Sequence, residues 1–342
     1  MTLLRKSHHA EGSYAVSVLV PVFNTPEHFL RQCLESLVGQ TLRELEIVAI
    51  DDGSTNEASS ILAEYARKYA NFQVITKPNT GYGDSMNRGI AAARGEYIGI
   101  CEPDDFADRR MFKTLYKKAA RFDCDIVKGN YRQHSEGQHR DPVWGILDAL
   151  VYDKVFHPAD DPRILLVQPS IWTAIYRRQM LIDNDIRFSP TPGASYQDAS
   201  FGHQCWISAK RGLLVRDALL HYRVDNAASS SKETGKVFAV CDEYARSFEF
   251  LRSRGSDLQT FGPTLNVMRF GVYIWNYDRI ASQFHLEFAQ RWAQEVAAEL
   301  DEGLLAREML PGFYPEVLDL LLKSPEELCE RYPDEIPQLG LL

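Results

Sequence analysis

Apolar runs and helical periods alternate along the first third of the chain. The apolar runs have the length of buried strands and cover residues 16–22, 46–50, 72–76, 97–101 and 125–128. Between them, apolar side chains recur at the spacing of one helix face, which predicts helices over residues 27–38, 56–69, 84–93 and 109–121. Strands that alternate with helices pair in parallel through right-handed crossovers. We therefore expect an α/β fold whose Rossmann-like, mostly parallel sheet is flanked by helices.

The pattern changes twice after residue 130. Over residues 131–230, prolines and aromatic residues interrupt the rhythm, and residues 218–222 resemble a strand. From Lys236 onward apolar residues recur at helical spacing, with further helices expected over residues 264–300 and 316–322. The sequence thus divides into a polar tail (1–14), a strand-rich half (15–130), a less regular half (131–235) and a helical C-terminal region (236–342).

The composition is that of a protein with a large core. The chain has 342 residues, of which 45% are hydrophobic, and a formal net charge of -9. Binding of nucleic acid needs a basic face, so the acidic balance argues against that class of partner. The six cysteines are scattered without a CxxC pair, which indicates a reduced, cytoplasmic protein. The sequence shows neither a signal peptide nor an apolar run of about 18 residues, and it is compatible with contact at the inner face of a membrane.

Two of the expected strands end in clusters of carboxylates. Asp51-Asp52-Gly53-Ser54 follows one strand and Glu102-Pro103-Asp104-Asp105 follows another. Because ligands of such sheets lie beyond the carboxyl ends of the strands, we expect both clusters at one edge. Negative charge at the edge of an apolar sheet costs free energy unless it is solvated, paired or bound to a cation. The pattern indicates a site for a metal ion and a phosphorylated ligand.

Each cluster also has a purely structural interpretation. Asp51–Ser54 has the composition of a turn that leads into a helix N-cap, and equally of a carboxylate that binds a nucleobase or a ribose hydroxyl. Acidic residues from Glu102 to Asp105 would suit the positive end of the following helix, but one carboxylate would be enough for that. Three of them favour a hard cation such as Mg²⁺ or Mn²⁺, which prefers carboxylate oxygen.

A glycine-rich loop precedes the helix over residues 84–93. Gly81-Tyr82-Gly83 lacks the third glycine of GxGxxG, and the chain has no GxxxxGK[ST] motif. The glycines allow a ligand to approach the backbone near Asn79, Asn87 and Arg88, although a plain loop with an exposed Arg88 has the same composition. The common dinucleotide and triphosphate motifs are therefore excluded.

Two further segments contain chemically active side chains. Asp198 follows a loop rich in proline and glycine and precedes an apolar helix, which suits either a helix N-cap or a general base. His221 and Arg223 end the strand expected over residues 218–222, and Ser229-Ser230-Ser231 follows. A loop with basic and hydroxyl groups could close over a diphosphate, whereas a lone histidine is more often a surface or core residue.

Taken together, these segments resemble the family 2 glycosyltransferases. The resemblance runs in order through SVLVPVFN, CLESLVGQTLRELEIVAIDDGSTN, NTGYGDSMNRGIAAARGEYIGICEPDDF, QPSIWTAIYRRQML, PGASYQDASF and HYRVDNAASSSK. The segment GKVFAVCDEYARSFEFL is similar to the helical tail of bacterial members that build capsular or lipopolysaccharide glycans. The resemblance implies a GT-A-type fold with a helical C-terminal extension. It makes residues 15–130 the nucleotide-sugar-binding half and residues 131–235 the acceptor-binding half with the catalytic base.

The resemblance also implies roles for individual residues. Asp198 corresponds to the catalytic base, with Gln197 where the family has Glu. Asp104 corresponds to the ligand of Mn²⁺ or Mg²⁺, with Glu102 at the first position of Asp-x-Asp, and His221 is a second candidate metal ligand. Either Asp52 or Asp51 corresponds to the nucleotide-contacting aspartate. The residues expected to bind the nucleotide sugar are Pro21, Phe23, Asn24, Asp51, Asp52, Asn79, Gly81, Asn87, Arg88, Glu102, Asp104 and Arg223.

The implied activity is an inverting transfer of a sugar from a nucleoside-diphosphate sugar, with a UDP-sugar as the expected donor. The expected acceptor is a hydroxyl of a saccharide or a lipid-linked saccharide, in the synthesis of a bacterial surface polysaccharide. A peripheral membrane contact and a homodimer are both compatible with the C-terminal helices. Two alternatives stay open: a nucleotidyltransferase, and a non-catalytic protein that binds a nucleotide sugar or a glycan. The absence of Lys and Arg from residues 21–26 disfavours the first, since a triphosphate needs a basic segment there.

Overall fold

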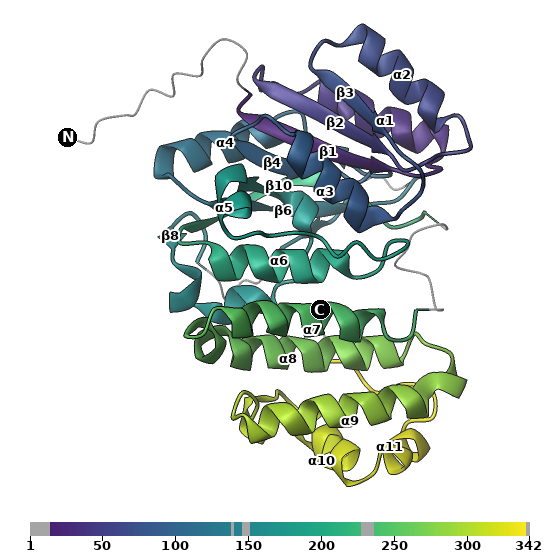
Figure 1. Cartoon of the computed structure of the whole chain (residues 1–342), viewed down its shortest axis with the longest axis vertical. Coiled ribbons are helices and arrows are strands. Elements are labelled where there is room, and N and C mark those ends of the chain that lie inside the picture. The colour runs from purple at the N-terminus through teal and green to yellow at the C-terminus, as the bar shows by residue number, and fades with distance from the viewer. Residues whose placement is uncertain (1–13, 138–139, 146–150, 227–235, 340–342) are drawn as a thin grey trace, which may run out of the picture. The chain divides into compact units, whose positions relative to one another are not determined.

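The computed structural model describes residues 14–137, 140–145, 151–226 and 236–339, and these form two compact units (Figure 1). The first unit contains Met1–Pro158 and Ser170–Ala227, and the second contains Ala159–Pro169 and Ala228–Leu342, each within the described ranges. The expected polar tail falls outside these ranges, except for residue 14. None of the helices among the described residues has the length and apolarity needed to cross a bilayer.

A single sheet of ten strands organises the first unit. Its main path runs β3-β2-β1-β4-β9-β6-β10-β5, with β7 paired to β6 and β8 paired to β10. The strands are β1 (Val16–Val22), β2 (Leu45–Asp51), β3 (Phe72–Thr76), β4 (Tyr97–Ile100), β5 (Phe106–Ala107), β6 (Ile126–His134), β7 (Val143–Trp144), β8 (Val155–Phe156), β9 (Ala174–Arg177) and β10 (Gly212–Arg223). The first four in sequence pair with one another in parallel, as the alternating pattern predicts.

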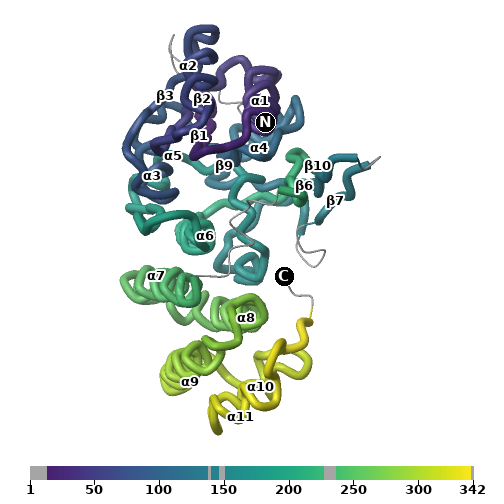
Figure 2. The backbone as a smooth tube through the Cα atoms, turned by 90° about the vertical axis from the view of Figure 1, so that its right-hand side faces the viewer, coloured from purple at the N-terminus to yellow at the C-terminus, as the bar shows by residue number. Residues whose placement is uncertain are grey.

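Helices cover both faces of this sheet. They are α1 (Glu27–Val38), α2 (Ala58–Lys68), α3 (Tyr82–Ala92), α4 (Met111–Phe122), α5 (Arg178–Asp183) and α6 (Gln197–Ser208). In Figure 2, α1 and α4 lie on one side of β1 and β2, and α3 lies on the other. Because both faces are covered, every residue of β1 and β2 is buried, which explains their near-continuous apolar sequence.

Beyond β4 the sheet becomes mixed. The strand β9 runs antiparallel to both β4 and β6, while β6 and β10 are parallel to each other. β6 continues to His134, past the predicted range 125–128, and β10 begins at Gly212, before the predicted range 218–222. The periodic signal of β10 is weak because its register shifts between Leu214 and Ala218, where Arg216 and Asp217 are exposed.

The second unit is helical, as the spacing of its apolar residues predicts. Its helices are α7 (Ala239–Ser253), α8 (Asp257–Tyr277), α9 (His285–Asp301), α10 (Tyr314–Lys323) and α11 (Pro325–Arg331), with the short 3-10 turn η2 (Pro162–Leu166) packed on α8. The range 264–300 is thus divided between α8 and α9. Aromatic rings form much of the core, including Tyr273, Phe288 and Trp292, each of which is fully buried.

Candidate functional site

The two acidic clusters lie at the same edge of the sheet. β1 pairs in parallel with β2 on one side and with β4 on the other, so all three strands run in one direction. β2 ends at Asp51, opposite Val22, and β4 ends at Ile100, just before the second cluster. The predicted convergence of the two clusters is confirmed at the level of the strands, with β1 between them.

The first cluster is well supplied with hydrogen-bond donors. Asp52 Oδ1 accepts from the ammonium of Lys77 and from the backbone N–H of Thr80 at 2.9 Å, and its Oδ2 accepts from Gly81 N at 3.0 Å. Asp51 Oδ1 accepts from Ser54 N at 2.9 Å and its Oδ2 from Ser59 Oγ at 2.5 Å. These contacts hold the turn after β2 and fix the loop before α3. They leave lone pairs on both carboxylates, since a carboxylate can accept about four hydrogen bonds.

The end of β1 lies beside this turn. Pro21 is buried in the strand, whereas the ring of Phe23 is 50% exposed. Asn24 has a positive φ of 50°, and its Oδ1 accepts from Thr55 N at 2.8 Å while its own N–H donates to Ser54 Oγ at 3.0 Å. The exposed ring next to a fixed polar turn provides a surface on which a nucleobase could stack.

The glycine-rich loop makes its closest contacts with the segment before α6. Gly81 has φ +99°, and a Cβ there would come within 2.6 Å of Thr191 O, so a side chain would displace the loop. Asn87 and Phe188 exchange two hydrogen bonds of 2.9 Å between the amide side chain and the backbone. Asn79 and Arg88 are exposed, and Arg88 pairs with Asp84. Asn87 therefore has a structural partner, which sequence reasoning did not anticipate.

The second cluster has too few donors for its charge. The hydroxyl of Tyr82 donates to Glu102 Oε1 at 2.8 Å. Burial, with the nearby charges of Asp104 and Asp198, raises the pKa of Glu102 to about 8. Asp105 Oδ1 accepts from Arg223 N at 2.8 Å, but its buried Oδ2 has no hydrogen-bond partner among the described residues, and burial raises the pKa of this carboxyl as well.

Asp104 lies between these two carboxylates and contacts the chain after β10. Its Oδ2 accepts from Asn226 Nδ2 at 2.8 Å, and its backbone carbonyl accepts from Arg223 Nε at 2.9 Å. The guanidinium of Arg223 is completely buried, lies over the ring of Phe29 at 4.1 Å and also donates to Gln32 Oε1. In this conformation Arg223 stabilises the turn that contains Asp104. It binds the backbone carbonyl of Asp104 and not the carboxylate.

Asp198 lies in the first turn of α6, within electrostatic range of Glu102 of the second cluster. Tyr196, with φ 58°, is the N-cap residue, and Asp198 Oδ1 accepts from Ala199 N at 3.0 Å. Burial raises the pKa of Asp198, and the charge of Lys128 opposes that shift. The charge of Asp198 in turn contributes to the raised pKa values of Glu102 and Tyr82, so these groups are within electrostatic range.

Gln197, the residue beside Asp198, has a clear structural role. Its side chain is buried, accepts from Ser195 N and donates to Thr191 Oγ1 at 2.8 Å. A neutral amide can both accept and donate within this loop, whereas a glutamate would only accept. The glutamine thus fits the backbone of residues 191–195.

His221 does not join Asp104. Its Nδ1 contacts Asp141 at 2.5 Å, its ring stacks on Phe106, and His134 lies nearby. Nothing in the described ranges links the imidazole to the second cluster. The serines at 229–231, expected to close over a diphosphate, lie outside the described residues.

Three contacts of the site were missed by the sequence interpretation. Lys77 pairs with Asp52, Tyr82 donates to Glu102, and Lys128, which is buried, donates to Ser170 O and Oγ at 2.7 Å beside Asp198. Burial lowers the pKa of Lys128 to about 7. Of these three contacts, only that of Lys128 could have been anticipated from the sequence. Lys128 lies within a buried strand, and an ammonium is rarely placed in a core without a partner.

A family model described as "Glycosyl transferase family 2" matches residues 17–168. The chain is 32% identical over 219 residues to the "Uncharacterized glycosyltransferase EpsJ" of Bacillus subtilis, which covers 61% of this chain and 60% of that protein. It is 30% identical over 223 residues to the "Uncharacterized glycosyltransferase YibD" of Escherichia coli, with 63% of each chain covered. The chain thus matches about three fifths of the length of these relatives.

A solved structure supports the fold. Residues 1–349 of S. aureus TarS in complex with UDP align with a TM-score of 0.70 at 19% identity, covering 93% of this chain and 91% of that one. The α/β fold of GT-A type with a helical C-terminal region, expected from the sequence, is confirmed.

Proposed function

Because residues 17–168 carry a family 2 glycosyltransferase domain, we propose that this chain transfers a sugar from a nucleoside-diphosphate sugar to an acceptor hydroxyl, with inversion at the anomeric carbon. The observation that carries the proposal is the second acidic cluster. Three carboxylates after β4 have few donors, and Glu102 among them lies within electrostatic range of Asp198, which suits a cation at the cluster and a base beside it. UDP-sugars are the first donors to test, since a protein of similar fold binds UDP.

The residues after β4 fit a divalent cation. Asp105 Oδ2 is buried without a partner among the described residues, and burial next to like charges raises the pKa of Glu102 to about 8. An ion held by Asp104, with Glu102 or Asp105 nearby, would give the unpartnered oxygen a partner and reduce the repulsion between the carboxylates. The site would supply the all-oxygen ligands that Mn²⁺ and Mg²⁺ prefer. When bound, such an ion would neutralise negative charge on the departing diphosphate.

Asp198 would act as the general base. An acceptor hydroxyl is a poor nucleophile until its proton is removed, and a positioned base contributes about 10²–10⁴-fold to the rate. Burial raises the pKa of Asp198 and so strengthens it as a base, while the charge of Lys128 limits the shift. Phe188, stacked at 4.0 Å on Phe201 of α6 and in contact with Tyr82, holds the base-bearing helix against the loop before α3.

The donor would occupy the edge formed by β1 and β2. Phe23 offers an exposed ring, Asn24 and Asp52 lie on fixed turns, and Gly81 permits close backbone approach. The acceptor would enter from the half that carries Asp198. We propose that the acceptor is a saccharide or lipid-linked saccharide of a bacterial surface polysaccharide, at the cytoplasmic face of the membrane; a poly(ribitol-phosphate) beta-glucosyltransferase of Bacillus spizizenii is among the relatives, at 28% identity.

The test is transfer by the Asp198→Asn variant. We expect turnover to fall by about 10²–10⁴-fold while binding of the donor is retained, because the substitution removes the base without changing the shape of the site. Donors are identified first by a thermal-shift screen of nucleotide sugars with and without Mn²⁺, since a ligand that binds the folded state raises the melting temperature.

The matched control is Asp185→Asn, which makes the same change on an exposed loop of the same unit, where the positive φ of 49° also suits asparagine. Release of nucleoside diphosphate at the wild-type rate by Asp198→Asn would refute the assignment of the base. Binding of nucleotide sugars without any transfer to saccharide acceptors would favour the non-catalytic alternative.

A further inference from the structure

A second group of side chains, apart from the acidic strand ends, has the composition of a metal site. His134 ends β6, His221 lies near the end of β10, and Asp141 lies just before β7. The pairing of the strands brings them together: His221 is opposite Arg132 on β6, and β7 folds back antiparallel on β6. Asp141 is 80 residues from His221 in sequence, so the sheet, and not a local motif, assembles this group.

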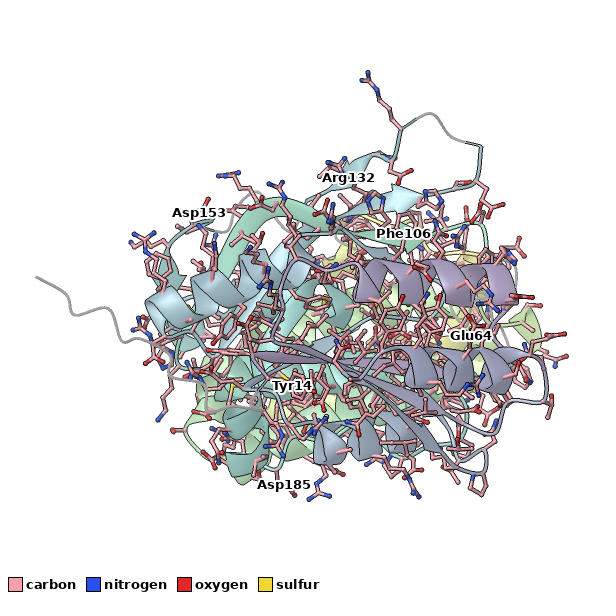
Figure 3. All side chains as sticks on the ribbon, turned by 90° about the horizontal axis from the view of Figure 1, so that it is seen from above. Tyr14, Glu64, Phe106, Arg132, Asp153 and Asp185 are labelled. Atoms are coloured by element: carbon pink, nitrogen blue, oxygen red, sulfur yellow. The ribbon has the colours of Figure 1, made fainter. Side chains whose placement is uncertain are left out.

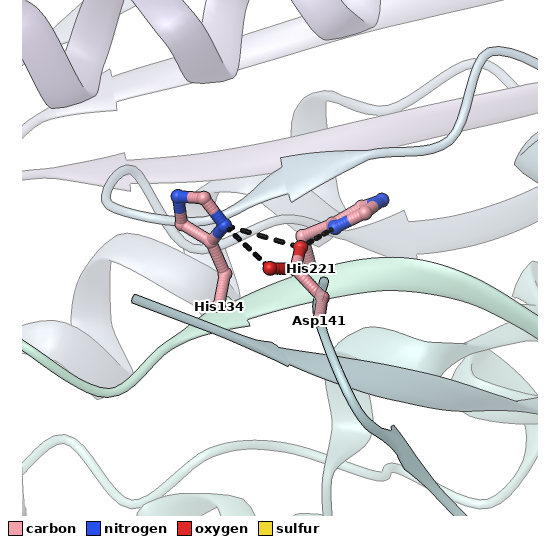
Figure 4. A group of neighbouring side chains, drawn as sticks. All are labelled: His134, Asp141 and His221. Atoms are coloured by element: carbon pink, nitrogen blue, oxygen red, sulfur yellow. Dashed lines mark hydrogen bonds and ion pairs between the residues drawn. The ribbon is translucent and has the colours of Figure 1, made fainter. Parts of the chain in front are cut away.

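Both imidazoles point at one carboxylate (Figure 4). His134 Nδ1 lies 3.0 and 3.1 Å from the two oxygens of Asp141, and His221 Nδ1 lies 2.5 Å from Oδ2. One ligand atom from each of the three residues lies within 4.8 Å of the others. Three ligand atoms so close on one side of a site are spaced for a single small ion.

The surroundings hold the imidazoles in place and leave the carboxylate available. Phe106 stacks on His221 with ring centroids 4.4 Å apart and meets His134 edge-on at 4.9 Å. Arg132 donates to the backbone carbonyl of Asp141 at 3.3 Å, so its charge is not paired with the carboxylate oxygens. Phe106 and Arg132 lie toward the same side of the first unit in Figure 3, and both are opposite His221 in the sheet.

The three side chains are accessible to an ion from solution. The exposed fractions of the side chains are 19% for His134, 14% for Asp141 and 22% for His221. Neutral imidazoles can place their protons on Nε2 and present the Nδ1 lone pairs to an ion in place of the hydrogen bonds.

We propose that His134, Asp141 and His221 bind one divalent transition-metal ion of the Zn²⁺ class, separate from the cation proposed at Asp104. Two imidazoles and a carboxylate are a ligand set of zinc and related ions, with a fourth position left to water. Mg²⁺ prefers all-oxygen ligands, so it does not suit this site. The ion would fasten the β6–β7 hairpin to β10, whose end leads to Arg223 and Asn226 and thus to the turn of Asp104.

The test is titration of the metal-free full chain with Co²⁺, whose visible absorption reports coordination by nitrogen, in the absence of any nucleotide sugar. We expect one equivalent to bind, to be displaced by Zn²⁺ and to resist excess Mg²⁺. His134→Gln and Asp141→Asn are each expected to weaken binding more than about 100-fold, because the loss of outer-shell partners alone costs about 10–100-fold. The control is His157→Gln, which changes an exposed histidine in the same unit and is expected to bind as the wild type does.

A second readout guards against variants that fail to fold. Zn²⁺ is expected to raise the melting temperature of the wild type and of His157→Gln, and to leave that of His134→Gln and Asp141→Asn unchanged relative to the same proteins in chelator. Equal Co²⁺ binding by wild type and His134→Gln, or no binding by the wild type, would overturn the proposal and leave a hydrogen-bonded cluster. Neither readout involves sugar transfer, so the result is independent of the proposed enzymatic function.

Discussion

The two acidic strand ends have the same kind of sequence but different surroundings. After β2, the carboxylates of Asp51 and Asp52 accept from three backbone N–H groups, a serine hydroxyl and the ammonium of Lys77. After β4, Glu102 accepts from one tyrosine, and Asp105 Oδ2 has no partner in the described part of the chain.

The number of hydrogen-bond donors thus distinguishes carboxylates that stabilise the fold, after β2, from carboxylates that are available to a ligand, after β4. A buried charge with its own donors stabilises the local structure, whereas a buried charge without them is retained at a cost in free energy. The scarcity of hydrogen-bond donors at Glu102 and Asp105 therefore favours the proposed cation site, and the donor-rich turn at Asp52 indicates a structural role besides any contact with the nucleotide.

The largest effect is expected on stability, from Asp52→Asn. The substitution leaves the ammonium of Lys77 buried without its closest counter-charge, so the free energy of unfolding is expected to fall by about 3–5 kcal/mol. Urea denaturation measures it. The double variant with Lys77→Met should recover part of the loss, since both charges are then removed. Unfolding of Asp52→Asn at the wild-type urea concentration would contradict the structural role.

The opposite pattern is expected for Asp104→Asn. Turnover should fall by about 10²–10³-fold, as when one group that stabilises developing charge is removed, while the free energy of unfolding changes little. Calorimetry of nucleotide binding with and without Mn²⁺ measures the loss of the metal-dependent part. If the variant binds nucleotide as the wild type does in the presence of Mn²⁺, Asp104 is not the ligand.

Lys128→Met tests the electrostatic effect of Lys128, on β6, on Asp198, the proposed base. Asp198 can accept a proton only when it is ionised, so turnover rises with pH through its pKa. Burial raises that pKa and Lys128 opposes the rise, so removing the ammonium is expected to move the acidic limb of the turnover profile to higher pH.

The control for this variant is Ser170→Ala, which removes a hydrogen bond to Lys128 but leaves the lysine in place. A pH profile of turnover for both variants separates the charge effect from loss of packing. An acidic limb that stays in place, or that moves to lower pH, in Lys128→Met would show that the lysine does not act on the base.

The smallest effect is expected from Ser59→Ala, which removes one donor to Asp51. Loss of a single hydrogen bond costs about 1 kcal/mol, and binding of the cation at the other cluster should be unaffected. Ser60→Ala is the matched control, because the Ser60 hydroxyl donates locally to the backbone carbonyl of Glu57, the N-cap residue of α2. A loss of cation binding in Ser59→Ala alone would mean that the two strand ends are coupled.

Much of the secondary structure of the first unit could be predicted, because each strand or helix is specified by the residues within it and at its ends. The strands Val16–Val22 and Phe72–Thr76 and the helix Glu27–Val38 have the predicted bounds, since each follows a single period with turn residues at its ends. Parallel pairing then places the carboxyl ends of β2 and β4 at one edge, so the position of the two acidic clusters could be predicted from the order of the elements alone.

The tertiary structure decided which of these side chains are paired. Three of the pairs join residues far apart in sequence. Lys77 and Asp52 are separated by 25 residues, Arg223 and Gln32 by 191, and His221 and Asp141 by 80. Such partners depend on packing between distant segments and on the register of short, irregular strands, for which the sequence has no periodic signal. Sequence therefore determined where negative charge gathers, because strand ends and turns are encoded locally, and only the folded chain decided which charges are balanced.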